Sequence, residues 1–398
     1  MKKHILIITS LLLSLCMHCA SSDVIRLYNR EISYSYSNPE SAFFKYIETS
    51  NIIMVMTCVE EKIVDVNHGD SDNKTALIYA SQYGHTGLVE YLVSRNADPD
   101  IQDEDGFTAL MTAVKYNKPE IVQILLNKNA NVKLPDSYGY TAMTIAIEYK
   151  LNAIVKILSS KPDCHSTLDA NGDTPLMFAL KNKYFSAAKI MAPFDKNLNI
   201  KNKDGQTALM LAVYWKYDDI VLIMLQNKFD LNIQDNIGQT ALMQAISYKF
   251  DSAASLIINK GCDVNIQDKS GQTALMFAAL YNYDNIVTQL IEKGAKIDTR
   301  DSTGQTALIK AANYNCYDAV AQLLDNGAEA NIQDKTGQTA LMKASENNYY
   351  YIAELLLQNK ADLDIVDNFN KDALTLAKAK KNEKIINLIS KFKNQQVK

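Results

Sequence analysis

The chain is poor in the residues that break helices and in those that build most active sites. Its 398 residues include only 14 glycines, 7 prolines, 5 histidines and 1 tryptophan. So little glycine and proline predicts a mostly helical protein, and so few histidines leave few candidates for a histidine-based active site. The formal net charge of −4 excludes a generally basic nucleic-acid binder. A hydrophobic share of 47% is typical of a folded chain rather than a disordered one.

Catalytic and metal-binding motifs are missing as well. The sequence contains no GxSxG, HExxH, P-loop or GxGxxG motif. Among Cys58, Cys164, Cys262 and Cys316, no CxxC or cysteine–histidine pair has the spacing of a zinc site, and no pair of carboxylates stands out as the acid and base of a glycosidase. We therefore expect a protein that is not an enzyme, with no catalytic residue, no metal and no cofactor.

Long apolar runs are also scarce, and the one that occurs lies at the N-terminus. The run from Ile5 to Leu15 follows Lys2 and Lys3. It is too short to span a bilayer, which needs about 20 apolar residues, and it is typical of a signal peptide. A buried N-terminal helix is the alternative, but the lysines and the polar residues after the run favour export. We predict a signal peptide over residues 1–22 and a periplasmic, cell-surface or secreted protein.

Two products of signal cleavage remain open. The run Leu13-Ser14-Leu15-Cys16 resembles a bacterial lipobox, which would remove residues 1–15 and leave Cys16 as a lipidated first residue. Such an anchor attaches a protein to a membrane surface without a spanning helix. Leu15 departs from the lipobox pattern, which has a small residue there. Cleavage after Ser21 or Ser22 would instead release a soluble protein.

A period of 33 residues organises the rest of the chain. We number each unit from the threonine of its Gly-Gln-Thr-Ala-Leu motif as position 0. Position +5 is alanine in every unit, and apolar residues return at +13, +14, +17 and +18, a spacing that marks one face of a helix. Each unit is therefore predicted to form two short helices. Position 0 is occupied by Thr75, Thr108, Thr141, Thr174, Thr207, Thr240, Thr273, Thr306, Thr339 and Asp372.

The residues before each first helix predict a tight turn and a cap. Position −2 is glycine in eight units and asparagine (Asn73 and Asn370) in the other two. Glycine and asparagine tolerate the left-handed backbone best, so we expect a positive φ at this position. The threonine that follows is a good N-cap, because its hydroxyl accepts a hydrogen bond from a free backbone N–H of the first helical turn.

These units resemble ankyrin repeats, a 33-residue turn–helix–helix family with a Thr-Pro-Leu-His-x-Ala motif. Thr174-Pro175-Leu176 is the closest copy of its opening. The histidine of the motif is absent, and methionine replaces it in six units, for example at Met210. We expect apolar packing of these methionines in place of a hydrogen bond between repeats.

The resemblance implies an all-α solenoid of about ten full repeats. Residues 70–394 form the array of ten 33-residue units, with the last unit as a C-terminal cap. Residues 38–69 are predicted to form a degenerate N-terminal capping repeat, and residues 23–37 a tether. Terminal repeats need a polar outer face, which the lysine-rich last unit provides.

Four cysteines lie in the predicted repeats, and the repeat spacing keeps them apart. Cys262 and Cys316 stand two repeats apart, which corresponds to about 20 Å at a helix-packing distance of about 10 Å. A disulfide needs α-carbons within about 7 Å. We therefore expect Cys262, Cys316, Cys58 and Cys164 to be free thiols.

Aromatic residues recur at position +8, at the end of each first helix. The family framework does not require them there, and tyrosine offers a large, rigid contact with a polar tip. The alternative is that repeat duplication copied them without use, and this applies even more to the glutamines at position −1, such as Gln206 and Gln239. We call the aromatic set the aromatic column: Tyr83, Tyr116, Tyr149, Trp215, Tyr248, Tyr281 and Tyr314.

The sequence thus predicts a binding module rather than a catalyst. In the family that the units resemble, partners dock in the concave groove, where position +8 lies. We predict a monomeric scaffold of the cell envelope or exterior that binds a protein partner, and no nucleic acid, through the aromatic column. The alternatives are a glycan-binding surface, with sugar rings stacked on the column, and a secreted ankyrin effector that acts on host proteins.

Overall fold

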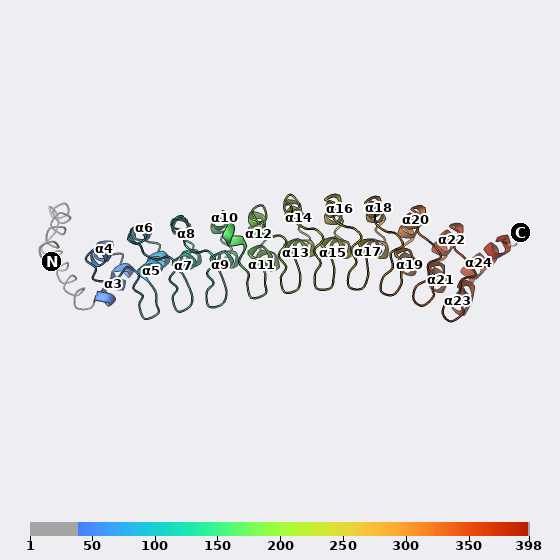
Figure 1. Cartoon of the computed structure of the whole chain (residues 1–398), viewed down its shortest axis with the longest axis horizontal. Helices are drawn as coiled ribbons and strands as arrows, with labels where there is room; N and C mark the ends of the chain where they lie inside the picture. The colour runs from blue at the N-terminus through green and yellow to red at the C-terminus, as the bar shows by residue number, and fades with distance from the viewer. Residues whose placement is uncertain (1–38, 397–398) are drawn as a thin grey trace. The chain divides into compact units, whose positions relative to one another are not determined.

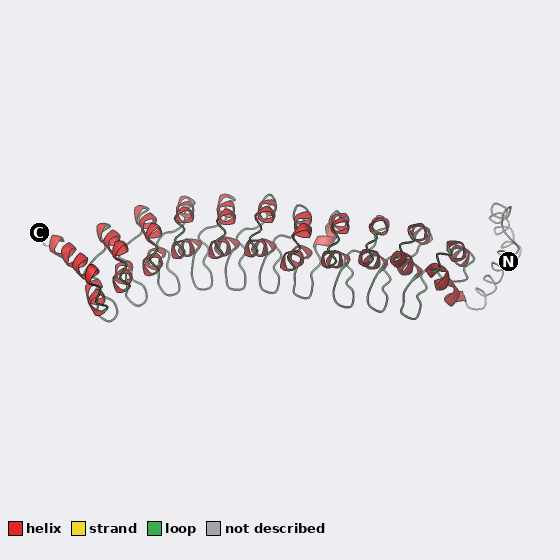
Figure 2. Ribbon diagram, turned by 180° about the vertical axis from the view of Figure 1, so that it is seen from behind, coloured by secondary structure: helices red, strands yellow, loops and turns green. Residues whose placement is uncertain are grey.

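The computed structural model describes residues 39–396. The predicted signal peptide, Cys16 and the predicted tether lie outside the described residues. Within residues 39–396 the chain forms 22 α-helices and one 3₁₀ helix and no strand, which confirms the all-α repeat fold (Figures 1 and 2). The chain divides at residues 167 and 168 into two compact units, which are described separately.

The first unit begins with a pair of helices and continues with three repeats. The pair is α3 (Pro39–Glu48) and α4 (Ile52–Glu60), and α3 packs against α5 of the first repeat. After the last repeat a short 3₁₀ helix, η1 (Pro162–His165), contacts α10. The first helices of the three repeats are α5 (Ala76–Tyr83), α7 (Ala109–Lys115) and α9 (Ala142–Glu148), and the second helices are α6 (Thr86–Ser94), α8 (Pro119–Asn127) and α10 (Asn152–Ser159).

The second unit contains seven repeats built in the same way. Its first helices are α11 (Pro175–Lys181), α13 (Ala208–Tyr214), α15 (Ala241–Ser247), α17 (Ala274–Leu280), α19 (Ala307–Asn313), α21 (Ala340–Glu346) and α23 (Ala373–Ala379). Its second helices are α12 (Phe185–Met191), α14 (Asp218–Met224), α16 (Asp251–Asn259), α18 (Asp284–Glu292), α20 (Tyr317–Asp325), α22 (Tyr350–Gln358) and α24 (Glu383–Gln396). Within this unit each first helix packs on the next first helix and on its own second helix (Figure 1).

Helix starts follow the predicted cap. In each of the ten repeats the position 0 side chain accepts a hydrogen bond from the backbone N–H three residues later, as in Thr273 and Met276 at 3.3 Å. The glycine or asparagine at position −2 has a positive φ in all ten, between 58° and 87°. Both predictions are confirmed.

The core is built from small and apolar side chains of the two helix rows. The alanines at +5 and the methionines that replace the family's histidine are almost completely buried, as at Ala245 and Met243. The small alanines let neighbouring helices approach closely, and the methionines fill the space between them. The predicted apolar packing at this position is confirmed.

The loops before the first helices are held by an aspartate or asparagine five residues before each cap, which is buried in six repeats and half-buried in the other four. One of its side-chain oxygens accepts two backbone N–H groups of the loop, as Asp268 does from Ser270 and Gln272 at 2.8 Å. This turn recurs in all ten repeats. Because the acceptor is supplied locally, each loop keeps one shape.

Neighbouring loops are also joined by hydrogen bonds. The backbone N–H of Lys269 donates to the carbonyl of Ile237 at 3.1 Å, and the same bond recurs from loop to loop within each unit. The Gln234 side chain adds a second link by donating to the carbonyl of Gln267 at 2.9 Å. The loops of each unit therefore stack on one another although no strand forms among residues 39–396.

None of the four cysteines of the repeats forms a disulfide, as predicted, and three of them are buried. Burial raises the pKa of the Cys164 thiol to about 12 and that of Cys262 to about 11.

None of the helices between residues 39 and 396 is both long and apolar enough to cross a membrane.

Candidate functional site

The aromatic column lies where each first helix ends. At Tyr248 the backbone N–H donates to the Gln244 carbonyl at 2.8 Å, and the next residue, Lys249, turns into the left-handed region with a φ of 56°. The interior at this level is already filled by the alanine at +5. The ring at +8 is therefore directed outward: six members of the column are between 36% and 59% exposed, and Trp215 is half-buried.

In the first unit the column is represented by three tyrosines. Tyr83 stacks on Tyr79 with the ring centroids 6.1 Å apart, and Tyr79 in turn contacts Phe44 of α3. Tyr116 and Tyr149 are about half exposed. Desolvation, together with neighbouring Glu48 and Tyr116, raises the pKa of the Tyr83 hydroxyl, so this group stays a neutral hydrogen-bond donor.

In the second unit two members of the column, Trp215 and Tyr248, belong to one cluster of rings. The Tyr214 ring meets Trp215 at 4.9 Å and Tyr248 of the next repeat at 5.3 Å, both edge to face. The ammonium of Lys183, from the preceding repeat, lies 4.4 Å from the centroid of the Trp215 ring. Three consecutive repeats thus share one aromatic surface with a cation on it.

The remaining column residues of this unit stand apart. Tyr281 contacts Tyr283 at 6.2 Å, and Tyr314 is 59% exposed. No ring contact among the described residues joins consecutive members of the column directly, and Tyr214 connects Trp215 to Tyr248. The column is therefore a series of separate exposed rings with one cluster.

The aromatic residues at position +10, beside the column, have a different role. Tyr184 and Phe250 are buried, with 9% and 6% exposure, and Tyr217 is half-buried. Tyr184, Tyr217 and Phe250 stand at the N-cap positions of the second helices, where their side chains make no cap hydrogen bond. Tyr184 and Phe250 belong to the core, and the Tyr217 ring lies against Phe185 with the centroids 3.6 Å apart.

Some exposed residues were not expected from the sequence. Tyr214, at +7, is 48% exposed and contacts two members of the column. At the loop tips, large side chains at position −3 are strongly exposed, with Tyr138 at 77%, Phe369 at 76% and Ile237 at 60%. These side chains do not recur from unit to unit, so a search for repeated positions passes over them.

A second unexpected feature is the residue that follows the column, at position +9. All ten repeats place it in the left-handed region. The family favours glycine there, but only Gly84 is a glycine, and four repeats have asparagine. Five repeats have lysine, with φ values of 56° or 57°: Lys150, Lys183, Lys216, Lys249 and Lys381. The departure from glycine was visible in the sequence, and the positive φ shows that a residue with a Cβ is strained at this position.

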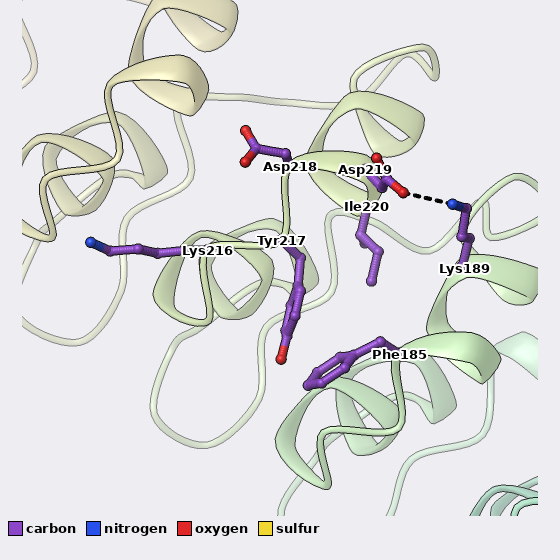
Figure 3. Close-up of a pocket in the computed structure, with 7 residues that line it drawn as sticks. All are labelled: Phe185, Lys189, Lys216, Tyr217, Asp218, Asp219 and Ile220. Atoms are coloured by element: carbon purple, nitrogen blue, oxygen red, sulfur yellow. Dashed lines mark hydrogen bonds and ion pairs between the residues drawn. The ribbon is translucent and has the colours of Figure 1, made fainter.

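A hollow of about 220 Å³ lies elsewhere in the second unit, between α12 and α14. Figure 3 shows the Phe185 and Tyr217 rings facing each other, with centroids 3.6 Å apart, and an ion pair between Lys189 and Asp219 at 2.6 Å. The Lys216 side chain points away from these groups (Figure 3). The lysines and Asp219 that line the hollow are thus paired with each other or turned away from it, which argues against a reactive centre.

No cluster of histidine, cysteine and carboxylate side chains among residues 39–396 could hold a metal ion. The lowered pKa values of Asp301 and Asp334 belong to structural turns. Burial alone would raise the pKa of Asp301, but donation by Lys310 at 2.8 Å and by the Thr303 hydroxyl outweighs it. Such shifts mark functional sites only when the groups line a cleft.

The stacked pairs of helices and the left-handed turn before each capped first helix define a helical repeat protein. A family model described as ankyrin repeats (3 copies) matches residues 12–103, 87–168, 151–235, 223–301, 242–334 and 308–398. The chain belongs to the ankyrin-repeat family. A search of curated proteins gives no match.

Proposed function

We propose that this chain is a non-enzymatic scaffold that binds a protein partner through the aromatic column. Ankyrin repeats are generally protein–protein interaction modules, and proteins built from them are typically scaffolds without enzymatic activity. The observation that carries the proposal is the exposure of large rings at one position of consecutive repeats, where the fold does not need them. Tryptophan and tyrosine dominate the energetics of binding surfaces.

The location of the scaffold is part of the proposal. Export to the envelope or exterior rests on the charged and apolar pattern of residues 1–22, and anchoring rests on Cys16. Mass spectrometry of the mature N-terminus tests both. A lipid mass at Cys16 that disappears in Cys16→Ser supports an anchor, cleavage after Ser21 or Ser22 supports soluble export, and an uncleaved chain refutes export.

Binding is tested by removing two rings of the cluster. Captured proteins are identified from envelope and culture fractions, and their affinities for the purified partner are measured with the wild type and with Trp215→Ala plus Tyr248→Ala. Because a central aromatic contributes about 2 kcal/mol or more, each truncation is expected to weaken binding by about 30-fold. A matched control truncates two exposed aromatics outside the column, Phe194→Ala plus Tyr351→Ala.

The outcomes separate the candidate functions. Loss of the same protein from the Trp215→Ala plus Tyr248→Ala variant, but not from the control, supports the proposal. Retention on a carbohydrate array that depends on the same two rings, with no protein partner, would point to a glycan-binding surface. Equal binding by the wild type and both variants would refute a role for the column.

A further inference from the structure

The inference concerns the chemistry of the partner, and it rests on the proposed function. It starts from three lysines at position +9 of consecutive repeats in the second unit, Lys183, Lys216 and Lys249. We call them the lysine stripe. Each follows the end of a first helix, each is exposed, and each has a φ of 56° or 57°.

These lysines occupy a backbone conformation that opposes them. The left-handed region costs an L-residue with a side chain about 1–2 kcal/mol, whereas glycine adopts it freely and asparagine tolerates it. The next three repeats of the same unit use asparagine at this position, at Asn282, Asn315 and Asn348. The fold therefore accepts a better residue at +9, and its own packing does not require a lysine.

The lysine charges are not neutralised within the protein. None of the three lysines takes part in an ion pair among residues 39–396. Lys183 rests on the Trp215 ring, and the Lys216 ammonium donates to the backbone carbonyl of Lys249 at 3.3 Å. The lysine stripe and the aromatic cluster thus form one surface over three repeats.

Few acidic side chains lie close in sequence to the lysine stripe. The segments that carry it, residues 180–183, 213–216 and 246–249, contain no aspartate or glutamate. At the starts of the following helices, Asp219 pairs with Lys189, Asp218 accepts a hydrogen bond from Ser252, and Asp251 is exposed. The three ammonium groups of the lysine stripe thus outnumber the carboxylates of Asp218 and Asp251, which take part in no ion pair among residues 39–396.

We infer that the lysine stripe and the aromatic cluster bind an acidic polypeptide segment of the partner. Successive repeats place the ammonium groups roughly 10 Å apart. A segment in the polyproline II conformation advances about 3.1 Å per residue with three residues per turn, so carboxylates three residues apart lie on one face about 9 Å apart and meet successive lysines. The rings contact the apolar parts of the intervening residues, and the charges supply attraction and register.

The inference is tested with poly-L-glutamate as the probe, because a flexible chain of carboxylates can meet the stripe at any register. Fluorescence anisotropy measures its affinity for the full chain at low and at physiological salt. The test variant, Lys183→Asn with Lys216→Asn and Lys249→Asn, carries the residue that the next three repeats use. The control variant, Lys228→Asn with Lys260→Asn and Lys293→Asn, removes three exposed charges elsewhere in the same unit.

We expect the wild type to bind poly-L-glutamate with an affinity that falls as salt is added. The test variant should bind at least 10-fold more weakly, and the control should change by less than 2-fold. Equal losses in both variants would show a nonspecific effect of net charge and overturn the inference. So would the absence of binding by the wild type, or a stripe-dependent preference for heparin or single-stranded DNA over poly-L-glutamate.

The same variants separate this inference from the proposed function. If capture of the natural partner needs Trp215 and Tyr248 but not the lysine stripe, the scaffold function stands and the inference fails. If the lysine variant binds poly-L-glutamate weakly while the aromatic variant still captures every partner, the proposed function fails instead. Circular dichroism of the lysine variant confirms that the fold is retained.

Discussion

Replacing a strained lysine by glycine is expected to stabilise the protein. The best site is Lys249, whose φ of 56° lies in the left-handed region directly after the first helix α15. Lysine at this position carries the cost of a Cβ that crowds the backbone, and glycine does not. In most exposed helical segments the same substitution would destabilise.

The magnitude follows from two opposing free energies. Relieving the left-handed conformation gains about 1–2 kcal/mol, and the larger freedom of glycine in the unfolded chain costs about 0.5–1 kcal/mol. The free energy of unfolding should therefore rise by about 0.5–1 kcal/mol for Lys249→Gly. Changing the whole lysine stripe to glycine should raise it by about 1.5–3 kcal/mol, because each site lies in a different repeat.

Urea unfolding followed by circular dichroism measures the change. A rise in the midpoint with an unchanged slope reports stability alone. The matched control is Lys260→Gly, because Lys260 also follows a helix of the same repeat but has a φ of −78°. Glycine there relieves nothing, so the midpoint should fall by the equivalent of about 0.5–1 kcal/mol.

Opposite signs are therefore expected for the lysine-to-glycine changes at positions 249 and 260. If Lys249→Gly lowered the midpoint as much as Lys260→Gly, the left-handed position would carry no strain. The lysine stripe would then carry no folding cost for a binding role to explain.

Three further predictions concern the loops, a buried ion pair and the thiols. In urea unfolding, Gly238→Ala should lower the free energy of unfolding by at least about 2 kcal/mol more than Gly261→Ala does. Both glycines have a positive φ, but only at Gly238 would a Cβ lie 2.6 Å from a backbone nitrogen of the neighbouring loop. Equal costs would contradict the loop stacking. Lys343→Met should cost about 1–3 kcal/mol at neutral pH, because the buried Asp334 carboxylate then keeps its Thr336 and Gln338 donors but loses the ammonium beside it. Although burial raises the pKa of Asp334, donation by Thr336, Gln338 and Lys343 lowers it on balance, so these contacts stabilise the fold above about pH 4. The cost should therefore shrink as pH falls through the folded pKa, and a cost independent of pH would refute this. Cys262 is the half-buried thiol, and in the folded protein it should react with a thiol reagent before the buried thiols do. The reaction should be slow, because burial raises the pKa of Cys262 to about 11. Labelling of the buried thiols before Cys262 would contradict the structure.

The repeat pattern was enough to predict the fold and the turns and caps that begin its first helices. The alanine at +5, the glycine at −2 and the threonine cap each follow from local sterics and hydrogen bonding, so their roles could be read from residue type and spacing. Thr273 and Gly271 behave in the structure as such residues behave in any helix start. The free state of the cysteines followed equally, because the repeat spacing sets their separation.

The binding surface was predictable only in part. The sequence placed Tyr248 and Trp215 at one repeated position, but it did not reveal that Tyr214 would join their rings. Aromatic residues also recur at +10, beside the column, and only burial assigns Phe250 among them to the core. Exposure depends on what the next repeat brings against a side chain, and a single unit does not contain that information.

What the sequence by itself determined is the unit: two short helices, a capped turn and a small-residue face, because these depend on interactions within a few residues. What only the tertiary structure decided is which side chains of the unit remain outside. The lysine stripe shows the difference. The sequence shows that lysine stands where the family favours glycine, but it does not show what surrounds that lysine. The φ of about 57° belongs to the turn within each unit, whereas the ring of Trp215 under Lys183 comes from stacking one repeat on the next. The same stacking leaves the three lysines without an ion pair among the described residues.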